Sequence, residues 1–143
     1  RTTRCLYGGG LCQRVDLRLM MDLNEIVDAW IAYQDADDRS PDRESNWWAI
    51  EQVFDWSLDC EGERLWEFVT TAYQRDVSDK VVGALAAGPL EDLLAKQGPQ
   101  FIERVEERAR KDPRFNYLLG GVWRNAMTEE VWQRVQAARL HVW

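Results

Sequence analysis

The sequence predicts an all-α protein, a single domain of seven or eight short helices. Apolar residues recur at helical spacing through most of the chain, and no segment alternates apolar and polar residues over a useful length. Pro89, Pro99 and Pro113 each stand where a helix can begin, because proline suits the first helical position. We expect a compact orthogonal bundle or a short array of helices similar to HEAT repeats.

Each expected helix carries one apolar stripe. The polar segment around Pro41 is expected to be a turn, and Gly88 and Gly98 can each end the preceding helix in the left-handed conformation. Gly120-Gly121 should either break its helix or let another helix approach closely. The approximate helix ranges are 22–36, 47–59, 65–73, 79–87, 89–97, 99–111, 113–123 and 129–135. The expected capping residues are Asp22, Ser45 or Asn46, Ser78, Asp112 and Thr128.

The composition is typical of one soluble globular domain. Of 143 residues, 45% are hydrophobic and 30% charged, and no apolar run approaches the roughly 20 residues that cross a bilayer. Most of the eight tryptophans are expected in the core, since an indole contributes a large buried area. Cys5, Cys12 and Cys60 form neither a disulfide framework nor a zinc motif, which favours a reduced, cytoplasmic protein. No contact with a membrane is expected, because no apolar run is long enough to cross one.

The first 20 residues differ from the rest of the chain. They are basic, and Gly8–Gly10 interrupts their apolar residues, so they do not resemble the core of a signal peptide. We interpret residues 1–20 as a non-native or disordered leader and residues 21–143 as the helical domain.

The net charge of −7 is unevenly distributed. Residues 22–63 contain thirteen acidic residues and only two basic ones, Arg39 and Arg43. Nucleic acid is therefore not an expected partner of this region, because phosphate binding needs Lys and Arg. A basic protein is the partner that such a surface favours.

A candidate partner-binding surface lies on the second expected helix. Glu51, Asp55 and Asp59 are spaced by four residues, so they share one helix face. Neighbouring Trp47 and Trp48 cannot both be fully buried on one side of a helix, so one of them, or Trp56, is expected to be partly exposed beside the acidic residues. We choose Trp48 as the candidate. Two interpretations remain open: a solvated acidic face, or a surface that binds a basic partner or a cation. The buried side of this helix is expected to consist of Trp47, Ile50, Val53, Phe54 and Leu58.

The second half of the chain contains the motifs GPLEDLL (88–94), DPRF (112–115), LLGGVW (118–123) and VWQRV (131–135). Together they resemble a bacterial domain-of-unknown-function family of small, mostly helical proteins, over roughly residues 25–139. The resemblance implies a helical fold and a bacterial origin. It carries over no catalytic residue, because the family has no assigned activity.

The residue types speak against catalysis by a nucleophile. His141 is the only histidine and follows the last expected helix. A Ser/His/Asp or Cys/His centre would therefore lack a well-placed base, and a zinc site would lack ligands. No cofactor is expected. The leading hypothesis is a non-enzymatic protein-interaction module, similar to an immunity protein or antitoxin that masks a basic partner. The alternatives are a carboxylate-dependent, metal-binding enzyme and a purely structural helical scaffold.

Overall fold

The computed structural model describes residues 22–143. This part of the chain consists of helices joined by loops, and no strand occurs within it. This confirms the predicted all-α fold. The expectations for residues 1–20 and for the boundary at Met21 lie outside the described residues. The helices are α3 (Leu23–Asp35), α4 (Pro41–Ser45), α5 (Trp47–Leu58), α6 (Gly62–Ala72), α7 (Asp79–Leu85), the π-helical turn η1 (Ala86–Leu90), α8 (Glu91–Lys111), α9 (Pro113–Leu119) and α10 (Glu129–Ala138).

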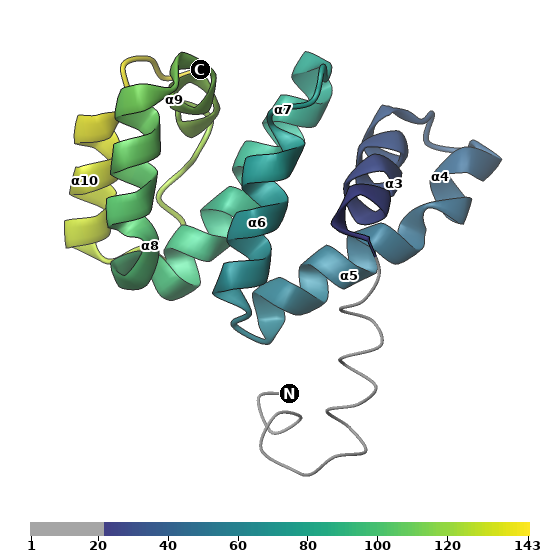
Figure 1. The fold of residues 1–143 in the computed structure, drawn as a ribbon, viewed down its shortest axis with the longest axis horizontal. Helices are drawn as coiled ribbons and strands as arrows, with labels where there is room; N and C mark the ends of the chain where they lie inside the picture. The colour runs from purple at the N-terminus through teal and green to yellow at the C-terminus, as the bar shows by residue number, and fades with distance from the viewer. Residues whose placement is uncertain (1–21) are drawn as a thin grey trace, which may run out of the picture.

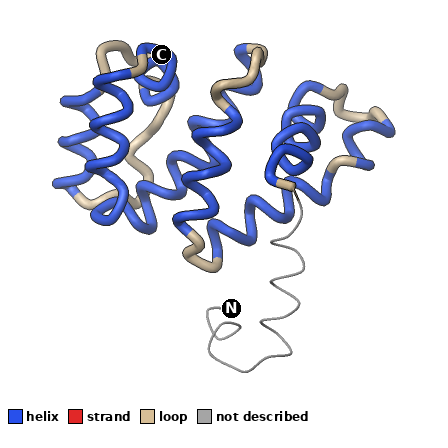
Figure 2. Tube along the Cα trace, in the orientation of Figure 1, coloured by secondary structure: helices blue, strands red, loops and turns tan. Residues whose placement is uncertain are grey.

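The helices follow one another along an arch. Figure 1 shows α3, α4 and α5 at one end, α6 and α7 in the middle, and α8, α9 and α10 at the other end. Figure 2 shows loops between them, the longest of which runs from the end of α9 to the start of α10. Helix α3 packs on α5, α6 and α7, and α8 packs on α6, α9 and α10, so one core runs through the arch. Its largest fully buried side chains include Phe68, Phe115, Ile26, Leu65, Leu85 and Leu90.

Local capping signals place most helix starts. Four of the expected capping side chains accept a hydrogen bond from a backbone N–H in the first turn: Asp22, Ser78, Asp112 and Thr128. Asn46 also precedes α5, but its side chain makes no capping bond and instead donates to the carbonyl of Asp42. The expected turn lies before Pro41, where the Ser40 N–H donates to the carbonyl of Asp37 at 3.0 Å, but the expectation was wrong for the residues that follow, which form α4. Ser40 caps α4 by accepting from the Asp42 N–H, with Pro41 as the first helical residue.

The predicted break at Gly88-Pro89 does not occur. The chain continues from α7 through η1 into α8, and Gly88 is not left-handed. The wider π-helical turn accommodates Pro89, which has no N–H to donate within the helix. Pro89 therefore lies inside a continuous helical run and does not begin one.

The break near Gly98 is a kink within α8. The non-helical residue is Gln97, with φ −133° and ψ 30°, and Gly98 is not left-handed. Gly98 has a packing role instead, because a Cβ there would lie 2.9 Å from both methyl groups of Val131. The missing side chain lets α10 approach α8 closely.

The glycine pair after α9 breaks the helix, as one of the two expectations had it. Helix α9 ends at Leu119, and the segment that approaches the glycines is the last stretch of chain and not another helix. The Trp143 N–H donates to the carbonyl of Gly120 at 3.2 Å, and its indole N–H donates to the carbonyl of Tyr117 at 2.7 Å.

The tryptophans are less buried than expected. Only Trp30 and Trp56 are core residues; Trp66 and Trp132 are half-buried, and the other four described tryptophans are exposed: Trp47, Trp48, Trp123 and Trp143. An indole can be partly buried and still contribute contact area, so tryptophan number alone does not measure core size. This distribution leaves aromatic side chains available on the surface.

Candidate functional site

Helix α5 is rotated relative to the prediction. Its buried side chains are Ala49, Val53, Trp56 and Ser57, whereas Phe54 is 55% exposed. Leu58 and Trp47 are also exposed and Ile50 is half-buried, so of the five predicted core residues only Val53 is buried. The helix carries apolar residues nearly all round, so its pattern did not specify the buried arc.

The solvent side of α5 carries two parallel stripes. At about 100° per residue, Trp47, Phe54 and Leu58 form an apolar stripe. Beside it lie Trp48, Glu51 and Asp55, which form an acidic stripe with a tryptophan at its start. The structure therefore places Trp48 and Glu51 on the surface, with Asp55 half-buried, and adds an apolar neighbour that the sequence pattern had assigned to the core.

Asp59 lies at the C-terminal end of α5 and is half-buried. Its backbone N–H donates to the carbonyl of Asp55 at 2.8 Å, and the next residue, Cys60, has a left-handed backbone with φ 56°. The chain thus turns at Cys60, and Gly62 is the first residue of α6. Asp59 marks the end of the acidic stripe.

An apolar hollow of about 180 Å³ opens beside the exposed stripe, between α3, α5 and the η1 turn. Phe54 forms one wall, and the other apolar lining residues are Trp30, Ile50, Val53, Ala84 and Pro89. We name this the Phe54 hollow. Its volume suits one or two apolar side chains of a partner rather than a large ligand.

A carboxylate stands at the rim of the Phe54 hollow. Asp92 of α8 lines it together with Ser57, whose hydroxyl donates to Asp92 Oδ2 at 3.2 Å. The ammonium of Lys96 donates to the same Ser57 hydroxyl at 2.9 Å, so this hydroxyl lies between a carboxylate and an ammonium group. These bonds join α5 to α8 and hold the Asp92 carboxylate at the mouth of the hollow.

Metal binding by the acidic stripe has no support in the geometry. Within residues 22–143, no three His, Cys, Asp or Glu side chains converge closely enough to hold a metal ion. Glu51, Asp55 and Asp59 lie on successive turns of one helix, so their side chains leave the helix at different positions along its axis. The metal-dependent alternative therefore lacks a ligand set among these residues.

Glu91 connects α8 to the loop after α9. Although it is the first residue of α8, it does not lie at a free helix N-terminus, because η1 runs directly into α8. Its carboxylate accepts from the backbone N–H of Trp123 at 2.9 Å and from the side-chain amide of Asn125 at 3.0 Å. Glu91 thus fixes the loop after α9, in which Asn125 is left-handed with φ 50°.

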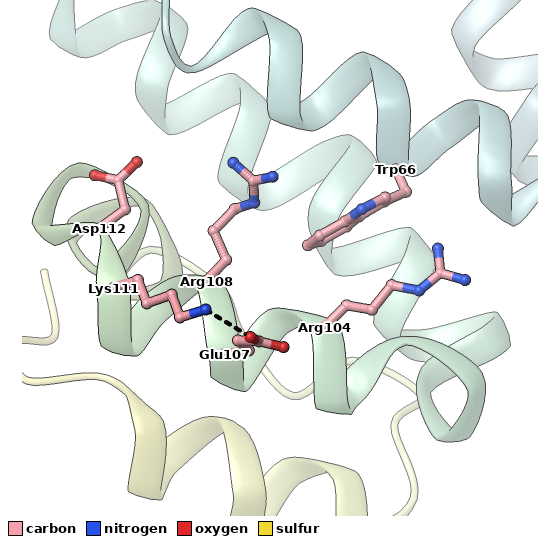
Figure 3. Close-up of a pocket in the computed structure, with 6 residues that line it drawn as sticks. All are labelled: Trp66, Arg104, Glu107, Arg108, Lys111 and Asp112. Atoms are coloured by element: carbon pink, nitrogen blue, oxygen red, sulfur yellow. Dashed lines mark hydrogen bonds and ion pairs between the residues drawn. The ribbon is translucent and has the colours of Figure 1, made fainter.

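A second hollow, of about 390 Å³, lies between α6 and α8 (Figure 3). Trp66 of α6 lies between the side chains of Arg104 and Arg108, and Glu107, Lys111 and Asp112 complete the lining. We name this the Trp66 hollow. Its lining has three cations and two carboxylates, and a third carboxylate, that of Glu63, is bound to Arg104 at 2.8 Å.

The Trp66 hollow was not among the sequence-based predictions, which expected most tryptophans in the core. Glu107 pairs with Lys111 of the same helix at 2.7 Å, and Glu106 pairs with Arg134 of α10. The available signal was the spacing of Arg104, Arg108 and Lys111, which puts all three cations on one helix face.

A comparison with family models places the chain. The model of the Family of unknown function DUF6869 matches residues 36–142. The chain belongs to this family. No curated protein and no solved structure matches the chain.

The region matched by DUF6869 covers every helix after α3 and therefore both surfaces described above, apart from Trp30 and the rest of α3. The predicted resemblance to a family of unknown function is thereby confirmed. No helix in residues 22–143 has both the length and the apolar character needed to span a bilayer.

Proposed function

We propose that this protein is a non-enzymatic protein-interaction module that binds a basic protein through α5. The single observation that carries the proposal is the Phe54 hollow beside an exposed apolar stripe and an acidic stripe. Interfaces commonly combine a central apolar anchor in a pocket with a polar or charged rim. The α5 surface offers both parts.

The expected partner segment follows from this chemistry. An apolar side chain of the partner would enter the Phe54 hollow and contact Phe54 and Trp30. Lys or Arg side chains next to that anchor would meet Asp92 at the rim of the hollow, and others would meet Glu51 on the acidic stripe. The excess of acidic residues in 22–63 would steer such a partner toward this end of the arch.

An immunity- or antitoxin-like role is the concrete form of the proposal, with the module masking a basic surface of its partner. A cytoplasmic location is part of the same proposal, supported by cysteine usage without a disulfide pattern. The partner of the α5 surface is a basic, amphipathic segment of another protein.

The test compares two variants that each remove one exposed aromatic side chain and add one negative charge. Phe54→Asp alters the α5 stripe, and Trp123→Asp, at a position 71% exposed on the loop after α9, is the matched control. Proteins retained from a lysate of the source organism would be identified, purified and titrated calorimetrically against all three forms. Circular dichroism would check that each variant is folded.

We expect a purified basic protein to bind wild type and Trp123→Asp alike, and Phe54→Asp at least about tenfold more weakly. Its affinity for wild type should also fall as salt is raised, because opposite charges meet at the rim. Equal affinity for wild type and Phe54→Asp would contradict the proposal, as would partners that are consistently acidic.

A further inference from the structure

The Trp66 hollow holds a cation that the fold has fixed in place. Arg108 Nη1 donates to the hydroxyl of Tyr73 at 3.0 Å, and Tyr73 is only 4% exposed. The guanidinium carbon lies 5.7 Å from the ring centroid of Trp66 and 6.0 Å from that of Tyr73. Two rings and one hydrogen bond therefore restrict the half-buried Arg108 side chain before any ligand arrives.

The charge of Arg108 has no carboxylate in contact. Among residues 22–143, no carboxylate oxygen lies within 4.0 Å of its guanidinium nitrogens, and its hydrogen-bond partner is a neutral hydroxyl. A guanidinium carries five N–H donors in a planar fork, so most of them remain available. A planar oxyanion, carboxylate or phosphate, is the group that such a fork recognises best.

The other charges around the hollow leave room for an anion. Arg104 is held by two parallel hydrogen bonds to the Glu63 carboxylate, each 2.8 Å long, and lies over the ring of Phe101, so it stays with these partners. Lys111 is bound to Glu107 at 2.7 Å, but both side chains are well exposed, and a single surface pair of this kind is weak. Lys111 can therefore turn toward a ligand at small cost.

Asp112 does not block the site. Its carboxylate accepts from the Tyr73 hydroxyl at 2.5 Å and from the backbone N–H of Arg114 at 2.9 Å. In Figure 3, Asp112 and Trp66 lie on opposite sides of Arg108. An anion on the Trp66 side of Arg108 would thus be separated from the Asp112 charge by the guanidinium itself.

The indole of Trp66 supplies a flat surface next to these donors. The indole contacts two core rings, Phe115 in a T-shaped arrangement at a centroid distance of 5.8 Å and Phe101 at 6.3 Å. The residue is nevertheless half-buried and lines the hollow, and Figure 3 shows its ring between Arg104 and Arg108. Aromatic rings stack on indole with little regard to their substituents.

We propose that the Trp66 hollow binds a small organic oxyanion that carries a flat ring. The ring stacks on Trp66, and the carboxylate or phosphate takes the free N–H donors of Arg108, with Lys111 adding charge. The site is independent of the α5 surface, because it lies on other helices and selects the opposite charge. A volume of about 390 Å³ lies within the range of small-molecule sites.

The experiment follows the indole N–H signal of Trp66 in nuclear magnetic resonance spectra of the full chain, assigned by its loss in Trp66→Phe. The probes are adenosine 5′-monophosphate, indole-3-acetate, adenosine and inorganic phosphate. The first two combine a ring with a phosphate or a carboxylate, and each of the last two offers one part alone.

We expect saturable shifts with at least one ring-bearing oxyanion, and binding of adenosine and phosphate at least about tenfold weaker. Arg108→Gln should weaken binding of that oxyanion about tenfold or more, because it removes the charged fork. Arg110→Gln, the same change two residues along α8 and outside the hollow, should leave the affinity within about twofold.

Lys111→Gln is a second variant, in case Arg108→Gln disturbs packing against Tyr73, and it should weaken binding by a smaller factor than Arg108→Gln. The proposal is overturned if no probe gives a saturable shift up to about 10 mM, a concentration at which even weak sites fill. It is also overturned if Arg108→Gln binds as wild type does, or if Arg110→Gln loses as much affinity.

Discussion

The indole of Trp143 occupies the space that a side chain at Gly121 would need. A Cβ on Gly121 would lie 2.5 Å from both Cζ2 and Cη2 of Trp143 and 3.0 Å from the Cβ of Ala86. The same indole stacks on Tyr117 with a centroid distance of 5.3 Å. The glycine pair thus allows the last stretch of chain to lie over the end of α9.

Gly121→Ala should therefore destabilise the protein by about 1–3 kcal/mol, the usual cost of overpacking. Gly88→Ala is the control, because nothing lies within 4 Å of a Cβ there and the residue is helical. That change should stabilise the protein by up to about 1 kcal/mol, since alanine is the better helix former. Urea denaturation measures both. An equal cost of Gly121→Ala in a Trp143→Ala background would show that the contact is not responsible.

The rotation of α5 predicts opposite outcomes for two tryptophans on the same helix. Trp56 is 5% exposed and contacts Phe68, so Trp56→Ala should cost about 3–5 kcal/mol of the free energy of unfolding. Trp48 is 38% exposed, so Trp48→Ala should cost less than about 1 kcal/mol. Thermal and urea unfolding measure the stability of the two variants. Similar losses of stability in both would mean that the buried face of α5 is wrongly assigned.

Asn116 fastens the C-terminal segment to the core. Its side-chain amide donates to the carbonyls of Ala109 and Ala138, at 3.2 and 3.0 Å, and its oxygen accepts from the Leu140 N–H at 2.9 Å. Asn116→Ala should cost about 1–3 kcal/mol, because polar groups on both sides lose their partner.

Hydrogen exchange gives the local readout for Asn116. The Leu140 amide should exchange faster in Asn116→Ala than in wild type, because its acceptor is gone. Gln133→Ala, which removes an exposed amide from α10, should change the stability by less than about 0.5 kcal/mol. Unchanged exchange at Leu140 would contradict the role assigned to Asn116.

The stability should depend on pH through Asp112. The hydrogen bond from the Tyr73 hydroxyl holds the pKa of Asp112 below its ordinary value, and the backbone N–H groups of Arg114 and Phe115 act in the same direction. A carboxyl whose pKa is lower in the folded state stabilises that state above its unfolded pKa of about 3.9. This contribution is lost as the pH falls through the folded pKa.

Tyr73→Phe removes the main cause of the lowered pKa of Asp112. When the pH is lowered from about 7 to about 3, the free energy of unfolding should therefore fall less in Tyr73→Phe than in wild type. Tyr117→Phe, the same change at an exposed tyrosine, should retain the wild-type pH dependence. Identical pH profiles for Tyr73→Phe and wild type would refute the coupling between Tyr73 and Asp112.

The sequence by itself determined the features that depend on neighbouring residues. The all-α class followed from apolar spacing, and the starts at Asp22, Ser78, Asp112 and Thr128 followed from capping chemistry, which acts within one helical turn. The acidic stripe of α5 was also visible, because residues four apart on a helix necessarily share a face.

Only the tertiary structure decided which surfaces these helices present. The apolar residues of α5 surround the helix, so its buried arc depends on the packing of α3 and α6, and Phe54 proved exposed while Trp56 is buried. The π-helical turn at Pro89 depends likewise on packing, since local preference alone favours a break there. The contact of Arg108 with Tyr73 joins residues 35 positions apart on different helices. No local pattern encodes such a contact, because it exists only where α6 and α8 meet.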